Sequence, residues 1–91
     1  MKNLKIETLG TNQNIVTVDN KQVTFISYDS TIADYDIQNR ILYLHGDMWD
    51  YSNTTRKYFK KFINYFTQFT YVDKKQFLKE LECDNPKIII K

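Results

Sequence analysis

The sequence contains few of the residues that mark loops, disulfides and metal sites. Its 91 residues include two glycines and one proline, which argues against a disordered chain and against a glycine-rich phosphate loop. Cys83 is the only cysteine, so an internal disulfide is excluded and a zinc site lacks ligands. His45 is the only histidine, so no second one can complete a two-histidine site. We expect no cofactor, and a lone thiol fits a reducing compartment.

Long apolar runs are also missing. No stretch approaches the roughly 20 apolar residues that span a bilayer, so we expect no membrane protein. Near the N-terminus, Leu4, Ile6 and Leu9 are separated by polar residues, unlike the apolar run of a signal peptide. We therefore expect a cytoplasmic protein.

Aromatic residues are plentiful, at 15% of the chain. Buried aromatic side chains contribute strongly to a core, so the chain can fold without disulfides or a metal. Independent cores usually need about 100 residues each, so we expect residues 1–91 to form a single domain.

Charge is distributed unevenly along the chain. Residues 1–50 hold seven acidic against four basic residues, a net charge of −3, whereas residues 51–91 hold nine basic against four acidic residues, a net charge of +5. This polarity indicates an oriented interaction with an acidic partner or with nucleic acid. The alternative is that the two halves form solvated surfaces of opposite charge that complement one another.

The first half of the chain has the hydrophobic period of β-strands. Alternation predicts a strand over residues 2–9, a hairpin of 14–18 with 22–28, and a second hairpin of 31–36 with 40–45.

After Gly46 the period changes to that of a helix. Ser52 is a suitable N-cap, and the apolar residues that follow recur on one side. These residues are Tyr58, Phe59, Phe62, Ile63, Phe66 and Phe69. The opposite arc is filled by Arg56, Lys57, Lys60, Lys61 and Asn64.

A second, shorter helix is predicted from the capping box of Asp73 and Gln76. It should end before Asn85-Pro86, because proline disfavours helical geometry in the residue ahead of it. Its inward residues are predicted to be Phe77, Leu78 and Leu81. The isoleucines of residues 87–91 predict a last short strand. The expected fold is therefore α+β: an antiparallel sheet of four to five strands, then two helices packed on one face, with a short C-terminal edge strand.

A histidine and two aspartates lie close together between the predicted strands and the first helix. His45, Asp47 and Asp50 are residue types that hold divalent metals or perform acid–base chemistry. We favour the structural interpretation, in which Gly46-Asp47 forms a turn and Asp50 supports the helix start. A magnesium nuclease built on carboxylates alone is the other alternative. Its ligands would be Asp29, Asp34, Asp36, Asp47 and Asp50. Because aspartates in turns and alternating strands are ordinarily exposed, we expect no metal site.

The basic side of the first helix is the main candidate for partner binding. It comprises Arg56, Lys57, Lys60 and Lys61. No acid occurs between Asp50 and Asp73, which is more one-sided than solubility requires. This side can contact an acidic protein surface or track phosphates, or it can be an ordinary solvated face.

Two further sets of residues are candidates. Trp49 and Tyr51 can stack on bases or contact a partner, although we favour packing against the helix start. An acidic surface of Asp29, Asp34 and Asp36 would suit a partner with a nucleic-acid-binding cleft that the protein mimics.

Two segments carry a resemblance to a known family. They are Ile26-Ser27-Tyr28-Asp29-Ser30-Thr31-Ile32-Ala33 and, after Leu42-Tyr43-Leu44, Trp49-Asp50-Tyr51-Ser52-Asn53-Thr54-Thr55-Arg56-Lys57. The chain resembles a family of small phage-encoded domains of unknown function. That family shares a Ser-Tyr-x-Thr-x-Ile-Ala element and a Trp-x-Tyr-Ser-x-Thr-Thr-x-Lys element opening a helix. The resemblance covers about residues 23–63.

The resemblance implies a phage or prophage product in a low-GC Gram-positive bacterium. Together with the charge pattern, it leads us to expect a non-catalytic protein that inhibits or redirects a bacterial host protein by surface occlusion. Anti-CRISPR or other anti-defence action, against a nucleic-acid-binding effector, is the most concrete form. The alternative is a nucleic-acid-binding accessory protein that uses the basic helix side.

Overall fold

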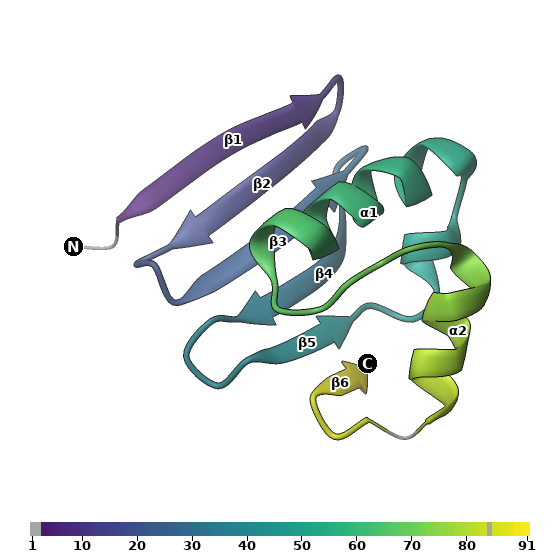
Figure 1. The fold of residues 1–91 in the computed structure, drawn as a ribbon. Coiled ribbons are helices and arrows are strands. Elements are labelled where there is room, and N and C mark those ends of the chain that lie inside the picture. Colours follow the sequence, from purple (N-terminus) through teal and green to yellow (C-terminus); the bar gives the residue numbers. More distant parts are fainter. Residues whose placement is uncertain (1–2, 84) are drawn as a thin grey trace.

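Five consecutive strands form an antiparallel meander, and a sixth strand joins its far edge (Figure 1). The computed structural model describes residues 3–83 and 85–91. Their elements are β1 (Leu4–Gly10), β2 (Gln13–Val18), β3 (Gln22–Ser27), β4 (Ser30–Asp36), β5 (Ile41–Leu44), the 3₁₀ turn η1 (Met48–Asp50), α1 (Asn53–Phe66), α2 (Lys74–Glu82) and β6 (Ile88–Ile90). The predicted α+β fold is confirmed. Lys2, the first residue of the predicted N-terminal strand, lies outside the described residues.

The sheet order follows the chain, β1-β2-β3-β4-β5-β6. Neighbours from β1 to β5 pair antiparallel, whereas β6 pairs parallel with β5. Adjacent strands follow one another in this order because tight turns join them, and residues in these turns adopt the positive φ that such turns need. Asp19 and Asn20 do so between β2 and β3, and Tyr28 and Asp29 do so between β3 and β4. The predicted strand 22–28 therefore ends one residue early, with Tyr28 in the turn.

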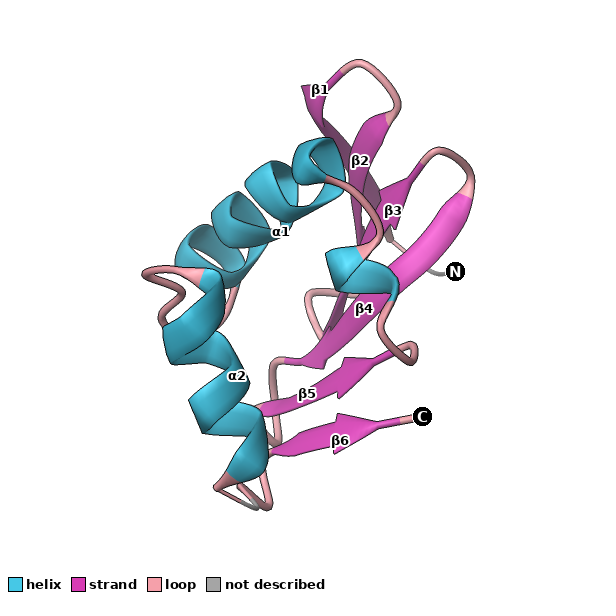
Figure 2. Cartoon of the chain, turned by 90° about the vertical axis from the view of Figure 1, so that its right-hand side faces the viewer, coloured by secondary structure: helices cyan, strands magenta, loops and turns pink. Residues whose placement is uncertain are grey.

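Both helices lie on the same side of the sheet (Figure 2). Ser52 caps α1 as predicted, since its hydroxyl accepts a hydrogen bond from the backbone N–H of Thr55 at 3.1 Å. Asp73 caps α2 in the same way, accepting from the N–H of Gln76 at 2.8 Å.

The core lies between the sheet and the helices and is rich in aromatic rings. Phe59 and Phe62 of α1 are fully buried against Phe25 of β3, with ring centroids 6.5 and 5.7 Å from the Phe25 ring. Phe77 is the buried residue of α2, and its ring lies 5.4 Å from that of Phe59. The helices are thus held to the sheet by a continuous set of ring contacts.

Two details of the helix prediction are wrong. Helical spacing extends the first helix to Phe69, but α1 ends at Phe66, where Thr67 has an extended backbone (φ −127°, ψ 172°) and its hydroxyl donates to the Ile63 carbonyl at 2.7 Å. Phe69 still packs on the core, edge-on to Tyr35. Leu78, predicted to point inward, is 38% exposed.

The two faces of the sheet differ, because side chains alternate along each strand. Residues such as Ile15, Val23 and Leu42 are buried beneath the helices. Their neighbours therefore lie on the opposite face, which we call the helix-free face.

Candidate functional site

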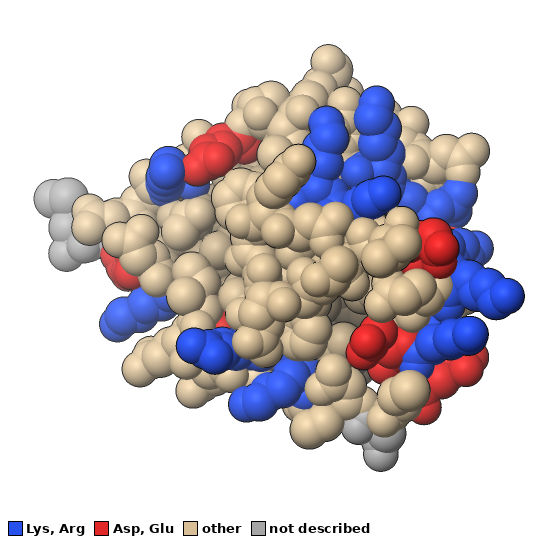
Figure 3. Space-filling model, viewed as in Figure 1, with Lys and Arg blue, Asp and Glu red and all other residues tan. Residues whose placement is uncertain are grey.

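Three lysines of α1 lie on the side of the helix that faces away from the sheet. Lys57 and Lys60 are exposed and Lys61 is half-buried. Figure 3 shows basic side chains gathered over α1, and a mixture of basic and acidic side chains over α2. The ion pairs among the described residues do not include these three lysines. They remain available to an external anion.

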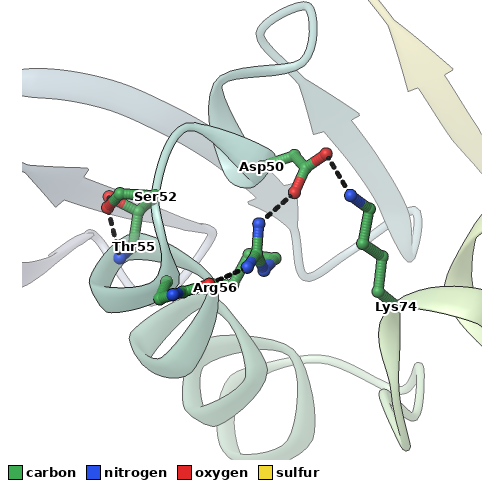
Figure 4. A network of polar contacts seen from close by, with 6 residues as sticks. Asp50, Ser52, Thr55, Arg56 and Lys74 are labelled. Atoms are coloured by element: carbon green, nitrogen blue, oxygen red, sulfur yellow. Dashed lines mark hydrogen bonds and ion pairs between the residues drawn. The ribbon is translucent and has the colours of Figure 1, made fainter.

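Arg56, the fourth basic candidate, is engaged within the fold instead. Its Nη1 donates to Asp50 Oδ1 at 2.6 Å, and its Nη2 donates to the side-chain oxygen of Asn53 (Figure 4). Asp50 Oδ2 lies 2.9 Å from the Nζ of Lys74, so one carboxylate joins η1 to both helices. Burial raises the pKa of Asp50, but the hydrogen bonds and charges of Lys74 and Arg56 outweigh it and lower that pKa below its ordinary value.

Tyr58 lies beside two of the three lysines that face away from the sheet, which we call the outward lysines (Lys57, Lys60 and Lys61). The Nζ atoms of Lys57 and Lys61 lie 5.6 and 5.1 Å from the centroid of its ring, within the range of cation–π attraction. The same ring covers Gly10 at the end of β1, where a Cβ would lie 2.4 Å from the Tyr58 hydroxyl oxygen. The sheet therefore fixes the ring against which two of these lysines lie.

The two aromatic candidates have different positions. Trp49 is only 3% exposed and packs among Phe59, Tyr71 and Phe77, with ring centroids 5.6, 6.5 and 5.1 Å away. Its ring is part of the core and does not reach a partner. Tyr51 is 74% exposed, so packing against the helix start, which we favoured for it, does not occur.

Beside Tyr51 is a small hollow of about 180 Å³, which we call the tyrosine hollow. It is lined by Ser27, Tyr28, Ser30, Ile32, Met48, Tyr51 and Thr55. Tyr28 is 51% exposed and has a φ of +49°, a conformation that non-glycine residues rarely adopt. At the base, the hydroxyl oxygens of Ser27 and Thr55 lie 3.3 Å apart.

The hollow forms where two distant segments of the chain meet. Ser27 to Ile32 come from the β3–β4 turn and its flanks, and Tyr51 and Thr55 come from the start of α1. These are the two segments that carry the resemblance described above. Tyr28 is not among the site residues predicted from the sequence, although its place in the first of these segments is a signal for it.

The three acidic candidates do not form one surface. Asp29 is in the β3–β4 turn, whereas Asp34 and Asp36 lie at the other end of β4, on the helix-free face. The acidic patch predicted to mimic a nucleic acid is therefore reduced to two residues.

Asp34 lies in a polar network on the helix-free face. Its carboxylate accepts hydrogen bonds from Thr24 Oγ1 at 2.6 Å and Gln22 Nε2 at 3.1 Å, and lies 2.8 Å from His45 Nε2. Burial raises the pKa of Asp34, but the hydrogen bonds from Thr24, His45 and Gln22 outweigh it, so that pKa is lowered. Asp36 accepts from the backbone N–H of Asn39 at 3.0 Å, which lowers its pKa as well.

The histidine and aspartates that were considered as a metal site do not converge. His45 contacts Asp34, Asp50 contacts the two helices, and Asp47 is exposed. Among residues 3–83 and 85–91, no three His, Cys, Asp or Glu side chains are grouped so that they could hold a metal ion. None of the helices in this part of the chain has the length and apolar character needed to cross a membrane.

Comparisons with known proteins place the chain in a family without adding a relative of established activity. No curated protein and no solved structure matched it. A family described as "Family of unknown function (DUF8033)" matched residues 4–79, which include β1 to β5, α1 and most of α2. The chain therefore belongs to this family of unknown function.

Proposed function

We propose that the protein is a non-catalytic binding protein of phage or prophage origin that inhibits or redirects a bacterial protein by covering part of its surface. The specific form we propose is anti-CRISPR or other anti-defence action in the cytoplasm of an infected or lysogenic bacterium. The observation that carries the proposal is the tyrosine hollow, with Tyr28 and Tyr51 exposed on its two sides.

Exposed tyrosines around a hydroxyl-lined hollow suit a protein partner. Tyrosine is enriched at protein interfaces because it offers a large contact area for the ordering of only two side-chain torsions. The hydroxyl of Ser30, which is half-buried in the lining of the hollow, can donate or accept a hydrogen bond, so it can adapt to a polar group of a partner. A partner side chain inserted between Tyr28 and Tyr51 would contact both rings.

The outward lysines supply positive charge on α1, the helix whose start lines the tyrosine hollow. Lys57, Lys60 and Lys61 would attract an acidic partner surface and speed its association more than they tighten the final complex. The proposed partner is thus an acidic bacterial protein, such as a nucleic-acid-binding defence effector with an acidic patch outside its nucleic-acid cleft.

A capture experiment with matched variants tests the proposal. Tagged protein is incubated with a lysate of a low-GC Gram-positive bacterium, and a stoichiometric partner is expected. The Tyr28→Ala/Tyr51→Ala variant should lose that partner, whereas Tyr65→Ala should keep it, since Tyr65 is as exposed as Tyr51 but lies near the other end of α1. Equal retention by both variants would overturn the role of the hollow.

The lysines are tested by charge reversal. Lys57→Glu/Lys61→Glu should weaken capture, most strongly at low salt, because exposed charges act mainly through long-range attraction. Lys75→Glu/Lys79→Glu is the matched control, with the same spacing on the exposed side of α2. If the two reversals behave alike, net charge and not the α1 surface governs binding.

Nucleic-acid binding is the second candidate, and the placement of Tyr58 favours it. An aromatic ring with two ammonium groups nearby resembles the arrangement that binds single-stranded nucleic acid, in which bases stack on rings and lysines neutralise phosphates. If Lys57, Lys60 and Lys61 each neutralise one phosphate, affinity for a labelled oligonucleotide should fall with a log–log salt slope of about −2 to −3. Absence of binding at low salt would remove this candidate.

A further inference from the structure

The helix-free face carries two rows of side chains that run across the sheet. In the first row, pairing between neighbouring strands aligns Ile6, Val16, Thr24, Asp34, Tyr43 and Ile89. In the second row it aligns Leu4, Val18, Gln22, Asp36 and Ile41. Each row is apolar or aromatic at both ends and polar in the middle.

Three of the four apolar ends of these rows are exposed, and the fourth, Ile41, is half-buried. Leu4 is 63% exposed, Ile6 is 67% exposed and Ile89 is 40% exposed. On the helix side of the same stretch of β1 lie Lys5 and Glu7, which form an ion pair of 3.0 Å. The register of β1 therefore places its charged residues on the helix side and its aliphatic residues on the helix-free face. Exposed aliphatic side chains on this face are explained if another protein surface covers them.

We propose that two copies of this chain pack through their helix-free faces, forming a symmetric dimer with four layers, helix–sheet–sheet–helix. The two-fold axis runs parallel to the strands, between β3 and β4. Two sheets that stack in this way lie about 10 Å apart, with their strands aligned to within about 30°.

The proposed axis stacks each row on the same row of the other copy, with the order of the strands reversed, and the side chains that meet are complementary. It places β1 over β6, β2 over β5 and β3 over β4 of the partner copy. In the first row, Val16 then lies over an aromatic ring, and the hydrogen-bonded pair of Thr24 and Asp34 lies over the same pair of the other copy. In the second row, the Gln22 amide lies over a carboxylate and Val18 lies over an isoleucine. A symmetric interface needs such self-complementarity, because the same patch serves both partners.

The charges of this face also suit a second copy. A shallow hollow of about 310 Å³ is lined by two acids, Asp34 and Asp36, and by two bases, Lys21 and Lys91, together with Gln22, Gln38 and Tyr43. These four charges balance, so two such faces do not repel one another. A strongly acidic or strongly basic partner would gain little from them.

The size of the face is consistent with a stable dimer. The six strands hold 33 residues, and at about 4.8 Å by 3.4 Å for each residue they cover roughly 540 Å² in projection. Protruding side chains make the accessible area larger than the projection. The result approaches the roughly 800 Å² that each partner contributes to a standard interface.

Sedimentation equilibrium of the full chain tests the dimer. Over micromolar concentrations we expect a mass twice the monomer value of 11.0 kDa. Ile6→Lys should raise the dissociation constant by about tenfold or more, because it buries a charge between the sheets. Tyr65→Lys changes an aromatic residue of similar exposure on the helix side and should leave the mass unchanged. A monomer at all concentrations, or equal effects of both variants, overturns the proposal.

Cross-linking tests the axis. Val16→Cys and Tyr43→Cys are prepared separately in a Cys83→Ser background, and a short bismaleimide is added to each and to their mixture. The proposed axis brings residue 16 of one copy over residue 43 of the other, so a covalent dimer should form in the mixture alone. A covalent dimer in the Val16→Cys sample by itself would overturn this axis. Circular dichroism of every variant checks that it is folded.

Discussion

Asp50 and Arg56 form an ion pair of 2.6 Å that joins the turn η1 to the first helical turns of α1. Because Asp50 also pairs with Lys74 at 2.9 Å, the same carboxylate links α1 with the start of α2 (Figure 4). The segment between the sheet and the helices is therefore held by polar contacts as well as by Trp49.

Asp50→Asn should destabilise the fold by about 1 kcal/mol. The substitution removes the charge that pairs with both bases, and partly exposed ion pairs contribute up to about that much. Urea unfolding followed by far-UV circular dichroism measures the change. Asp47→Asn is the control, since Asp47 is exposed in the adjoining turn. Equal stabilities of Asp50→Asn and the native chain would show that the pairs contribute nothing.

The polar network around Asp34 should make the free energy of unfolding depend on pH. The pKa of Asp34 is lower in the folded chain than in the unfolded chain, so the folded state is favoured wherever this carboxyl is ionised. That contribution is present above about pH 4 and is lost as the pH falls through the folded pKa. Unfolding free energies between pH 6 and pH 2.5 should fall less steeply for Asp34→Asn than for the native chain. Asp47→Asn should retain the native slope, and an unchanged slope in Asp34→Asn would contradict the prediction.

Gly10→Ala should be destabilising because of Tyr58. A Cβ at this position would lie 2.4 Å from the hydroxyl oxygen and 2.6 Å from Cζ of the ring, so the ring must move. Forced repacking of this kind costs about 1 to 3 kcal/mol. The same substitution should cost less in a Tyr58→Ala background, which thermal unfolding of the native chain, the two single variants and the double variant would measure. Additive effects would show that the two residues do not interact.

Gly46→Ala provides a contrast with Gly10→Ala. A Cβ there meets no atom within 4 Å, but Gly46 has a φ of +57°, which disfavours alanine by about 1 kcal/mol. Asparagine tolerates such a φ, so Gly46→Asn should recover most of the loss, whereas Gly10→Asn should not.

Gln13→Met should stabilise the fold. Gln13 is fully buried, and neither its amide nitrogen nor its carbonyl oxygen has a hydrogen-bond partner among the described residues. Replacing an unsatisfied buried amide by an apolar side chain of similar length removes a penalty of about 1 to 3 kcal/mol. Urea unfolding should show a higher midpoint with an unchanged slope. A lower midpoint would mean that the amide is satisfied in solution.

Much of the fold could be predicted because local patterns determine it. Alternation in Gln22 to Ser27 and the helix-capping serine Ser52 each depend on residues close in sequence. The end of α1 depends instead on the loop that follows it. Asn64, predicted as a surface residue, bonds the backbone N–H and carbonyl of Tyr71 at 2.7 and 3.0 Å and so holds that loop against the helix.

The candidate site could be predicted only in part. The outward direction of Lys57 and Lys60 follows from helical periodicity, which is a local property. Pairing of Arg56 with Asp50 depends on how η1 turns back toward α1, and the tyrosine hollow depends on a turn of β3–β4 reaching the start of α1. No pattern within a single segment shows which distant side chain will satisfy a charge or complete a cavity.

The burial of Trp49 makes the protein its own fluorescent reporter. It is the only tryptophan, and its ring contacts Phe59 of α1 and Phe77 of α2 at once. Emission from this indole would shift to longer wavelength whenever either helix leaves the core, even while the β-sheet persists. Comparing tryptophan emission with the sheet signal of circular dichroism would therefore separate partial opening of the helical layer from complete unfolding.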